Sequence, residues 1–322
     1  MADVHDAGSM GDSHPTAKGP AVQLKDIKKR LPLRVLSAVE WEHWTRRGYV
    51  IVNDAVPAEN IRRLVDLLWE FSEMSPTDPI TWSRRQLRDH QMLELNNSGM
   101  VEIYNHQYLW DNRQSPRVYD AFVDIWDRTD LWVAIDRANL NTPNREGRRF
   151  TGFVHWDVDT SLTPLPIGVQ GVLSLVDTDS EIGGFQCVPE LFRTLEDWRT
   201  TQPVGRNPFH PDPAGFEVVN VPMTAGDLLI FNSLLPHGIR PNASPDRVRI
   251  AQYVSMFPAD ERNVAERDAR VRSWREREPP KRPAFPGDPR EWERARYATA
   301  RLTTLGERLL GLSSWYGESA RS

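Results

Sequence analysis

The chain has 322 residues, of which 39% are hydrophobic, and it carries a formal net charge of −5. This length allows one large domain with extensions or two ordinary domains, and the acidic balance argues against a general nucleic-acid-binding protein. The single cysteine, Cys187, excludes an internal disulfide. Because a reducing compartment fits that cysteine usage and no apolar run opens the chain, we expect a cytoplasmic protein without a signal peptide or membrane span.

Helices are predicted first along the chain. Residues 37–47 carry a capping-box pattern at their start and are followed by a glycine, which predicts a short helix. A strand is predicted at residues 49–52, and residues 58–71 have apolar positions at helical spacing. Further helices are predicted at residues 115–127 and 191–198. Further strands are predicted at residues 100–104, 131–140, 150–157, 168–177, 185–188, 216–221, 227–231 and 247–257.

Many short strands separated by turns predict a mainly β fold with flanking helices, a β-sandwich or jelly roll rather than a parallel βαβ fold. We divide the chain into a disordered tail at residues 1–22, a barrel domain with N-terminal helices at residues 23–258, and a charged helical extension at residues 259–322. The extension contains two predicted amphipathic helices at residues 261–278 and 289–310, which could cover the barrel or form a homodimer contact.

His155 and Asp157 stand two residues apart inside a short β-prone run. Side chains at positions i and i+2 of a strand point to the same face, so the imidazole and the carboxylate would project together. They supply two of the three ligands of a 2-His-1-carboxylate site for non-haem Fe(II). The best candidate for the third ligand is His237, which follows His155 by 237 − 155 = 82 residues.

A site with three protein ligands leaves three positions of an octahedral metal open. A bidentate cosubstrate could take two of these positions and O2 the third. If the cosubstrate is 2-oxoglutarate, its distal carboxylate needs a fixed cation, and arginine offers a fork of donors that matches a carboxylate. Arg247 and Arg249 lie on the strand predicted after His237 and would point to the same face.

Three segments together carry a family resemblance. They are His155-Trp156-Asp157, the Gly-Gly-x-x-x-Val-Pro run at residues 183–189, and the Gly-Asp-x-x-x-Phe run ending in His-Gly at residues 226–238. With the opening helix and strand, they make the chain similar to the phytanoyl-CoA dioxygenase family of Fe(II)/2-oxoglutarate oxygenases over roughly residues 35–258. The usual Gly-Ser-His ending of the second segment is lost here.

The resemblance implies a cupin-like double-stranded β-helix core with Fe(II) on His155, Asp157 and His237. It implies 2-oxoglutarate and O2 as cosubstrates, with the anchoring arginine at Arg249 in preference to Arg247. A carboxylate at position 157 favours hydroxylation or another C–H oxidation of a small organic substrate, releasing succinate and CO2. Related halogenases have Gly or Ala at that position, so halogenation is not expected.

Four further residues are weaker candidates. Gln170 is a candidate cosubstrate contact, and His106 either lines the substrate pocket or is structural. Arg137 and Asn139 share one face of a predicted strand, so they either reach the substrate or form part of a buried ion pair.

Two alternative functions stay open. They are a cupin-like metalloenzyme that does not use 2-oxoglutarate and a barrel that binds without catalysis. No nucleic-acid or membrane partner is expected.

Overall fold

A computed structural model describes residues 22–83, 90–144 and 152–317, so the predicted tail lies, apart from its last residue, outside the described residues. The strands are β1 (Tyr49–Val52), β2 (Met100–Val101), β3 (Leu131–Val133), β4 (Ala138–Asn141), β5 (Val169–Ser174), β6 (Gly184–Cys187), β7 (Val219–Asn220), β8 (Leu228–Asn232), β9 (His237–Arg240), β10 (Arg249–Tyr253) and β11 (Met256–Pro258). The helices are α1 (Ala38–Arg47), α2 (Ala58–Phe71), α3 (Leu93–Ser98), α4 (Gln107–Arg113), α5 (Pro116–Trp126), α6 (Pro189–Arg193), α7 (Leu195–Thr201), α8 (Val264–Glu276), α9 (Trp292–Arg296) and α10 (Thr304–Leu310), with 3-10 turns at Leu24–Asp26 and Pro79–Ser83.

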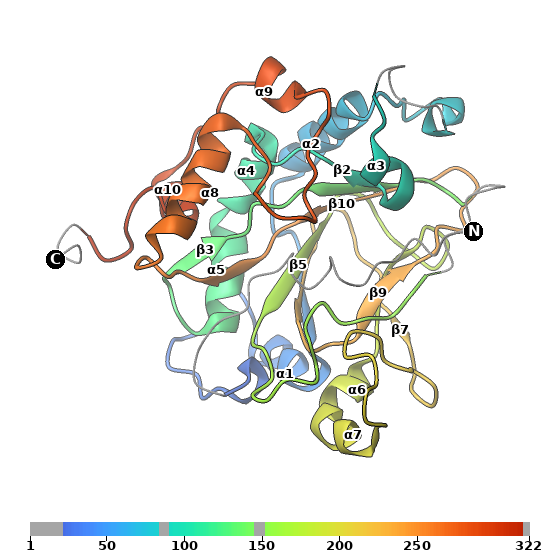
Figure 1. Ribbon diagram of the computed structural model, residues 1–322, viewed down its shortest axis with the longest axis vertical. Helices are drawn as coiled ribbons and strands as arrows, with labels where there is room; N and C mark the ends of the chain where they lie inside the picture. The colour runs from blue at the N-terminus through green and yellow to red at the C-terminus, as the bar shows by residue number, and fades with distance from the viewer. Residues whose placement is uncertain (1–21, 84–89, 145–151, 318–322) are drawn as a thin grey trace.

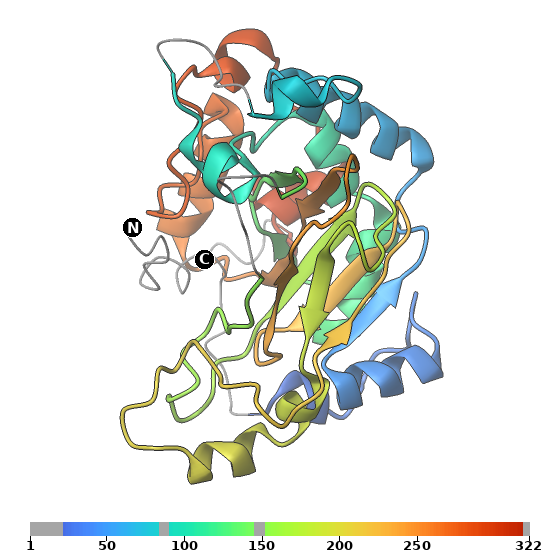
Figure 2. The same cartoon turned by 90° about the vertical axis from the view of Figure 1, so that its right-hand side faces the viewer.

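A six-stranded antiparallel sheet in the order β1-β8-β5-β10-β4-β2 is the centre of the molecule (Figure 1). A smaller sheet, β7-β6-β9, supplies the second layer. Figures 1 and 2 place the C-terminal helices toward the upper end of the large sheet and α6 and α7 at its lower end. The mainly antiparallel β arrangement with flanking helices agrees with the fold class predicted from the sequence.

Strand alternation divides the core in two. On β8, Leu228 and Ile230 pack into the larger cluster beneath the helices, whereas Leu229 and Phe231 pack into a second cluster with Phe185 of the small sheet. Successive side chains of a strand point to opposite faces, so one strand serves both clusters. The second cluster lies between the two sheets, beside the histidines described below.

The predicted helices at the N-terminus are confirmed. Ser37 and Glu40 form the capping box of α1, and Gly48 ends it with a left-handed backbone at φ 78°. A side chain at Gly48 would also meet the Phe192 ring at 2.8 Å, so the glycine serves both the turn and the packing of α6.

Two long predicted strands are each divided in two. β10 pairs with β4 and β11 pairs with β3, and between these pairings the four residues 134–137 face the three residues 253–255. The extra residue is a bulge-like interruption, which ends the ladder and redirects side chains locally. The interruption contains Asp136 and Arg137, both of which line the cavity described below.

The predicted strand at residues 150–157 is wrong. Residues 145–151 lie outside the described part of the chain, and the remainder forms only an isolated bridge between His155 and His237. The bridge is nevertheless a closely spaced pair, because each residue donates its N–H to the other's carbonyl, at 2.8 and 3.0 Å. Two backbone hydrogen bonds are therefore enough to place the two histidines side by side.

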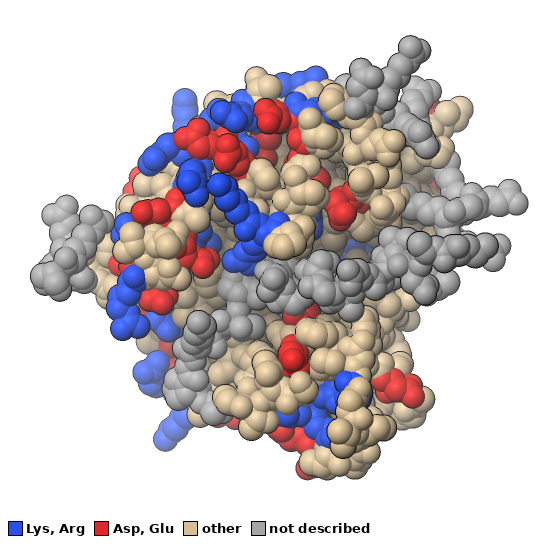
Figure 3. All heavy atoms as spheres, in the orientation of Figure 1, with Lys and Arg blue, Asp and Glu red and all other residues tan. Residues whose placement is uncertain are grey.

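The C-terminal segment packs against its own chain. Arg270 of α8 is buried and donates to the carbonyls of Val133, Leu309 and Leu310. Leu309 and Leu310 also belong to the main core. The predicted helix at residues 289–310 is two short helices, α9 and α10, and the outer face of this segment carries mixed charges (Figure 3). None of the helices in the described residues has the length and apolar character that a membrane crossing needs.

Glu293 of α9 is expected to make stability pH-dependent. Its buried carboxyl group accepts the backbone N–H groups of Tyr104, at 2.7 Å, and Asn105, and burial raises its pKa from 4.5 to about 7. The folded protein then binds more protons than the unfolded chain between these values. The free energy of unfolding should therefore fall by about 3 kcal/mol as pH rises through that window. Denaturant unfolding of wild type and of Glu293→Gln across this pH range measures the effect. The free energy of unfolding should depend less steeply on pH in the variant, and an equally steep dependence in both proteins would contradict the raised pKa of Glu293.

Candidate metal centre

Three buried side chains converge at the bridge. His237 opens β9, His155 lies opposite it, and Asp157 follows two residues later. His155 Nε2 lies 2.9 Å from Asp157 Oδ1, and His237 Nε2 lies 3.2 Å from Asp157 Oδ2. The three ligand atoms all lie within 4.8 Å of one another, which is compact enough for one metal ion.

The outer nitrogens of both rings are committed to carbonyl oxygens. His155 Nδ1 lies 3.0 Å from the carbonyl of His237, and His237 Nδ1 lies 3.0 Å from the carbonyl of Leu235. A carbonyl only accepts hydrogen bonds, so each Nδ1 carries the proton. In the neutral rings the Nε2 lone pairs then point toward Asp157. Lone pairs facing a carboxylate need a cation between them, and a hydrogen bond on the outer nitrogen is how metal-binding imidazoles are commonly oriented.

Charge and burial oppose each other at this centre. Burial disfavours the ionised form of Asp157, but His155 and His237, when their rings are protonated in the absence of a metal, outweigh it by charge and hydrogen bonding and hold the pKa of Asp157 well below its ordinary value. Burial lowers the pKa of His237, although the neighbouring Asp157 carboxylate, which can accept from a protonated ring, acts in the opposite direction. An ionised carboxylate and a neutral imidazole are the protonation states that a divalent cation requires of its ligands.

Gln170 of β5 supports the carboxylate. Its Nε2 donates to Asp157 Oδ2 at 2.6 Å. The glutamine therefore orients the candidate metal ligand, a contact that was not anticipated for it. Partners that orient metal ligands contribute about 10- to 100-fold to metal affinity. We expect Gln170→Leu to weaken Fe(II) binding by that factor in an anaerobic titration, with little change in fold; wild-type affinity would contradict this orienting role.

The triad opens into a cavity of about 370 Å³. Gln170, Val172 and Tyr253 line it from the large sheet, and Phe185 and Ile239 line it from the small one. This cavity lies between the two sheets and contains all three candidate ligands.

Arg249 also lines this cavity. It begins β10, is 4% exposed, and donates from Nη1 to Asn139 Oδ1 at 3.0 Å. Among the residues that the structure describes, no carboxylate lies within ion-pairing distance of Arg249. A buried cation without a counter-ion is costly, so this guanidinium favours an anionic ligand.

Arg247 does not share the cavity, which corrects its prediction as an alternative anchor. It precedes β10, lies on the surface, and pairs with Asp179 at 2.6 Å and Glu181 at 3.0 Å. The strand begins at Arg249, so the alternation that would place both arginines on one face does not extend back to Arg247.

His106 takes the structural one of the two roles that the sequence left open, and not that of a substrate contact. It does not line the cavity. It caps α4 by accepting the N–H of Tyr108 at Nδ1, and its ring packs edge-on against Tyr297. Burial lowers its pKa to about 4, which keeps the ring neutral.

Arg137 and Asn139 have separate roles. Arg137 lines the cavity but is paired with Glu102, as the ion-pair interpretation expects. Asn139 holds Arg249 and donates to the carbonyl of Ser98 at 2.9 Å. No sequence pattern pointed to Asp136 or to residues 283–286 of the C-terminal segment, which also line the cavity.

Comparisons with known proteins agree with this geometry. Over 243 residues the chain is 22% identical to Ava biosynthesis cluster protein O of Aspergillus versicolor, covering 68% of this chain and 77% of that protein. It is 23% identical over 263 residues to a Dictyostelium discoideum protein provisionally named as a phytanoyl-CoA dioxygenase. This match covers 68% of this chain and 74% of that protein. The crystal structure of JW0805 of Escherichia coli shares the fold at 16% identity, with a TM-score of 0.60 over 86% of this chain and 81% of that one.

The model of the family described as phytanoyl-CoA dioxygenase matches residues 44–251. That match spans 251 − 44 + 1 = 208 of the 322 residues and contains the two histidines, Asp157 and Arg249. The chain therefore belongs to the phytanoyl-CoA dioxygenase family.

Proposed function

We propose that the protein is an Fe(II)- and 2-oxoglutarate-dependent oxygenase that hydroxylates or otherwise oxidises a C–H bond of a small organic substrate. The observation that carries the proposal is one cavity that contains both the triad and a buried arginine that pairs with no carboxylate among the described residues. In hydroxylation, one atom of O2 enters the substrate C–H bond and the other enters succinate, while 2-oxoglutarate loses CO2.

The donor set fits iron. Two imidazole nitrogens and one carboxylate oxygen, with space beside them, are the ligands of the non-haem Fe(II) oxygenases. His155, Asp157 and His237 would hold the ion. Fe(II), bound with 2-oxoglutarate and O2, supplies the oxidising chemistry, and the protein supplies orientation and exclusion of water.

Arg249 would hold the distal carboxylate of 2-oxoglutarate. Asn139 fixes one side of its guanidinium and Tyr253 also contacts it, and because the guanidinium lines the cavity it can meet an anion there. The pairing would supply a counter-charge that no described carboxylate provides for this buried arginine.

Asp157 also bears on the type of reaction. Its two oxygens lie beside His155, His237 and Gln170, so the carboxylate would fill one position of a metal bound here. A site filled in this way favours C–H oxidation over halogenation, which needs that position for a halide.

The two facing sheets support a cupin-like double-stranded β-helix, and we infer that residues 23–258 form this unit with 259–322 as its helical extension. A homodimer through the extension stays a prediction; the burial of Leu309 and Leu310 in the protein's own core gives it no support. Residence in the cytoplasm and a small-molecule partner are likewise proposals.

An anaerobic titration tests the function. Metal-free protein receives Fe(II) and then 2-oxoglutarate, and the visible charge-transfer band of the chelate is recorded. We expect the band to reach its full intensity at one equivalent of 2-oxoglutarate per protein chain. Fe(II) binding without the band would favour a cupin-like enzyme that does not use 2-oxoglutarate, and absence of metal binding would favour a non-catalytic barrel.

A further inference from the structure

The C-terminal segment supplies one wall of the metal cavity. Pro283, Ala284, Phe285 and Pro286 line the cavity together with the triad. These residues lie beyond residues 44–251, where the family model matches. The wall facing the candidate metal site is therefore built by a part of the chain outside the region that identifies the family.

Phe285 is the residue of this wall whose side chain is held most firmly by its neighbours. Its side chain is 5% exposed, its ring meets Tyr104 edge-on at 5.7 Å between centroids, and the Arg137 guanidinium lies 4.6 Å from the ring centroid. A cation over an aromatic face and an edge-to-face ring pair both favour one ring orientation. The ring is held from two sides rather than free to swing.

Glu102 joins the backbone of the wall to the barrel. It pairs with Arg137, accepts the hydroxyl of Tyr104, and accepts the N–H of Gly287 at 3.0 Å. The charge of Arg137 is thus already matched by Glu102. The part of a ligand that meets this wall should be uncharged, because an added anion would find no unmatched cation here.

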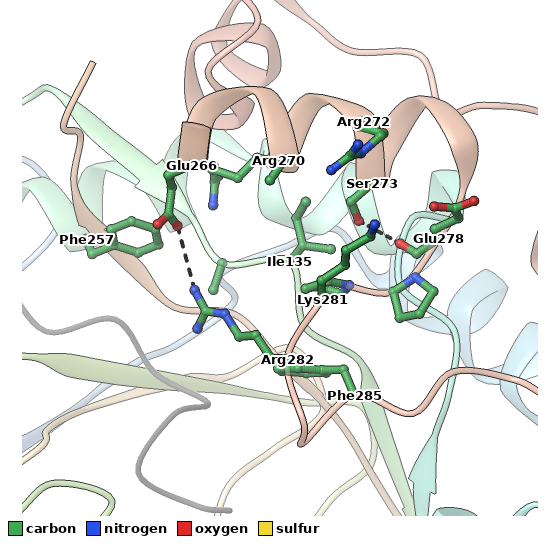
Figure 4. Close-up of a pocket in the computed structure, with 14 residues that line it drawn as sticks. Ile135, Phe257, Glu266, Arg270, Arg272, Ser273, Glu278, Lys281, Arg282 and Phe285 are labelled. Carbon is green, nitrogen blue, oxygen red and sulfur yellow. Dashed lines mark hydrogen bonds and ion pairs between the residues drawn. The ribbon is translucent and has the colours of Figure 1, made fainter. Parts of the chain in front are cut away.

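A second hollow, of about 200 Å³, lies on another side of Phe285. Ile135, Phe257 and Arg282 contribute to its lining, and Figure 4 shows these side chains with Phe285 at the lower edge of the hollow. Phe285 lines both this hollow and the metal cavity. One aromatic side chain therefore stands at the boundary between the two spaces.

We propose that Phe285 determines substrate length, by closing the metal cavity against the neighbouring hollow, and that Arg137 is a positioning residue that holds its ring. This inference rests on the proposed function, since it takes the metal cavity as the substrate chamber. It assigns to Arg137 a role through Phe285 rather than a contact with substrate.

A graded series of primary n-alcohols tests the proposal, because these probes are uncharged and differ only in length. Calorimetric titrations are made on the full-length protein, with and without anaerobic Fe(II) and 2-oxoglutarate. Affinity should rise about fourfold with each methylene group until the chain reaches Phe285, and then stop rising. Phe285→Ala should move that limit to probes longer by about two or more methylene groups, since it opens the boundary.

Three further variants make the result specific. Ala284→Leu adds volume to the same wall of the cavity, so the affinity should stop rising at a shorter alcohol than in wild type. Arg137→Met should lengthen it in the direction of Phe285→Ala, while the chelate band persists. Lys281→Ala, an exposed change in the same segment, should keep the wild-type limit.

The outcomes separate this inference from the proposed function. A missing chelate band with a length limit that moves in the variants would overturn the oxygenase and keep the boundary at Phe285. A normal band with a limit that Phe285→Ala and Ala284→Leu leave unchanged would overturn the boundary alone. Failure of the wild type to bind any of the probes would also overturn it.

Discussion

Asp157→Ala is expected to abolish formation of the Fe(II)–2-oxoglutarate chelate and to lower 2-oxoglutarate turnover by more than about 100-fold, since residues that only orient metal ligands already contribute 10- to 100-fold. The carboxylate lies between both imidazoles, 2.9 Å from His155 Nε2 and 3.2 Å from His237 Nε2. Its loss removes one of three candidate ligands and the negative charge that matches a divalent cation. The titration that tests the proposed function also measures this variant.

Asp159→Ala is the matched control. Asp159 lies two residues further along, and its carboxylate accepts the backbone N–H and the hydroxyl of Ser161 at a partly exposed turn. It is an acidic residue in the same segment that takes no part in the triad. We expect its chelate band to equal that of wild type. A normal band in Asp157→Ala, with the variant folded by circular dichroism, would remove Asp157 from the metal site.

The closeness of the three candidate metal ligands could be predicted from the sequence, although strand alternation explains it only in part. Alternation predicts that His155 and Asp157 lie together, yet the structure holds them with a single bridge to His237. The grouping is the same because a bridge fixes the same local backbone as a strand over two or three residues. Spacing predicts that much, whereas the length of a strand depends on distant partners.

The choice between the two arginines needed the structure. Arg247 and Arg249 have the same parity, so alternation cannot separate them. The start of β10 at Arg249 separates them, together with the acidic partners Asp179 and Glu181 that hold Arg247 at the surface. These partners come from a turn more than 60 residues away along the chain, which no local pattern reveals.

Apart from Arg137, which was a candidate, the opposite wall of the cavity was also beyond the sequence. Asp136 lies in a one-residue difference between two paired strands, and Phe285 comes from a Pro-rich break that was predicted only to separate two helices. Both features arise from long-range packing. A bulge is defined only by the strand it pairs with, and the Pro-rich loop lines the cavity only because the C-terminal segment packs back against the barrel.

Arg249→Ala is expected to weaken 2-oxoglutarate binding by at least about 30-fold, because removal of one partner of a buried charged pair costs about 2 kcal/mol or more. Fe(II) binding should persist, since Arg249 contacts none of the three candidate ligands in the structure. The chelate band should therefore return at high 2-oxoglutarate concentration, unlike in Asp157→Ala. Titration of 2-oxoglutarate into the anaerobic Fe(II)-loaded protein measures the shift.

Arg247→Ala is the control for charge, because it removes the same side chain two residues away. Its guanidinium is solvent-exposed and paired with surface carboxylates, where an ion pair contributes little. We expect its affinity for 2-oxoglutarate to stay within about twofold of wild type, as surface substitutions of this kind usually change little. The opposite result, a large loss in Arg247→Ala with Arg249→Ala unaffected, would mean that the buried arginine serves the fold. The cosubstrate would then be held from outside the cavity, whereas Arg249 lines the cavity together with the three candidate ligands.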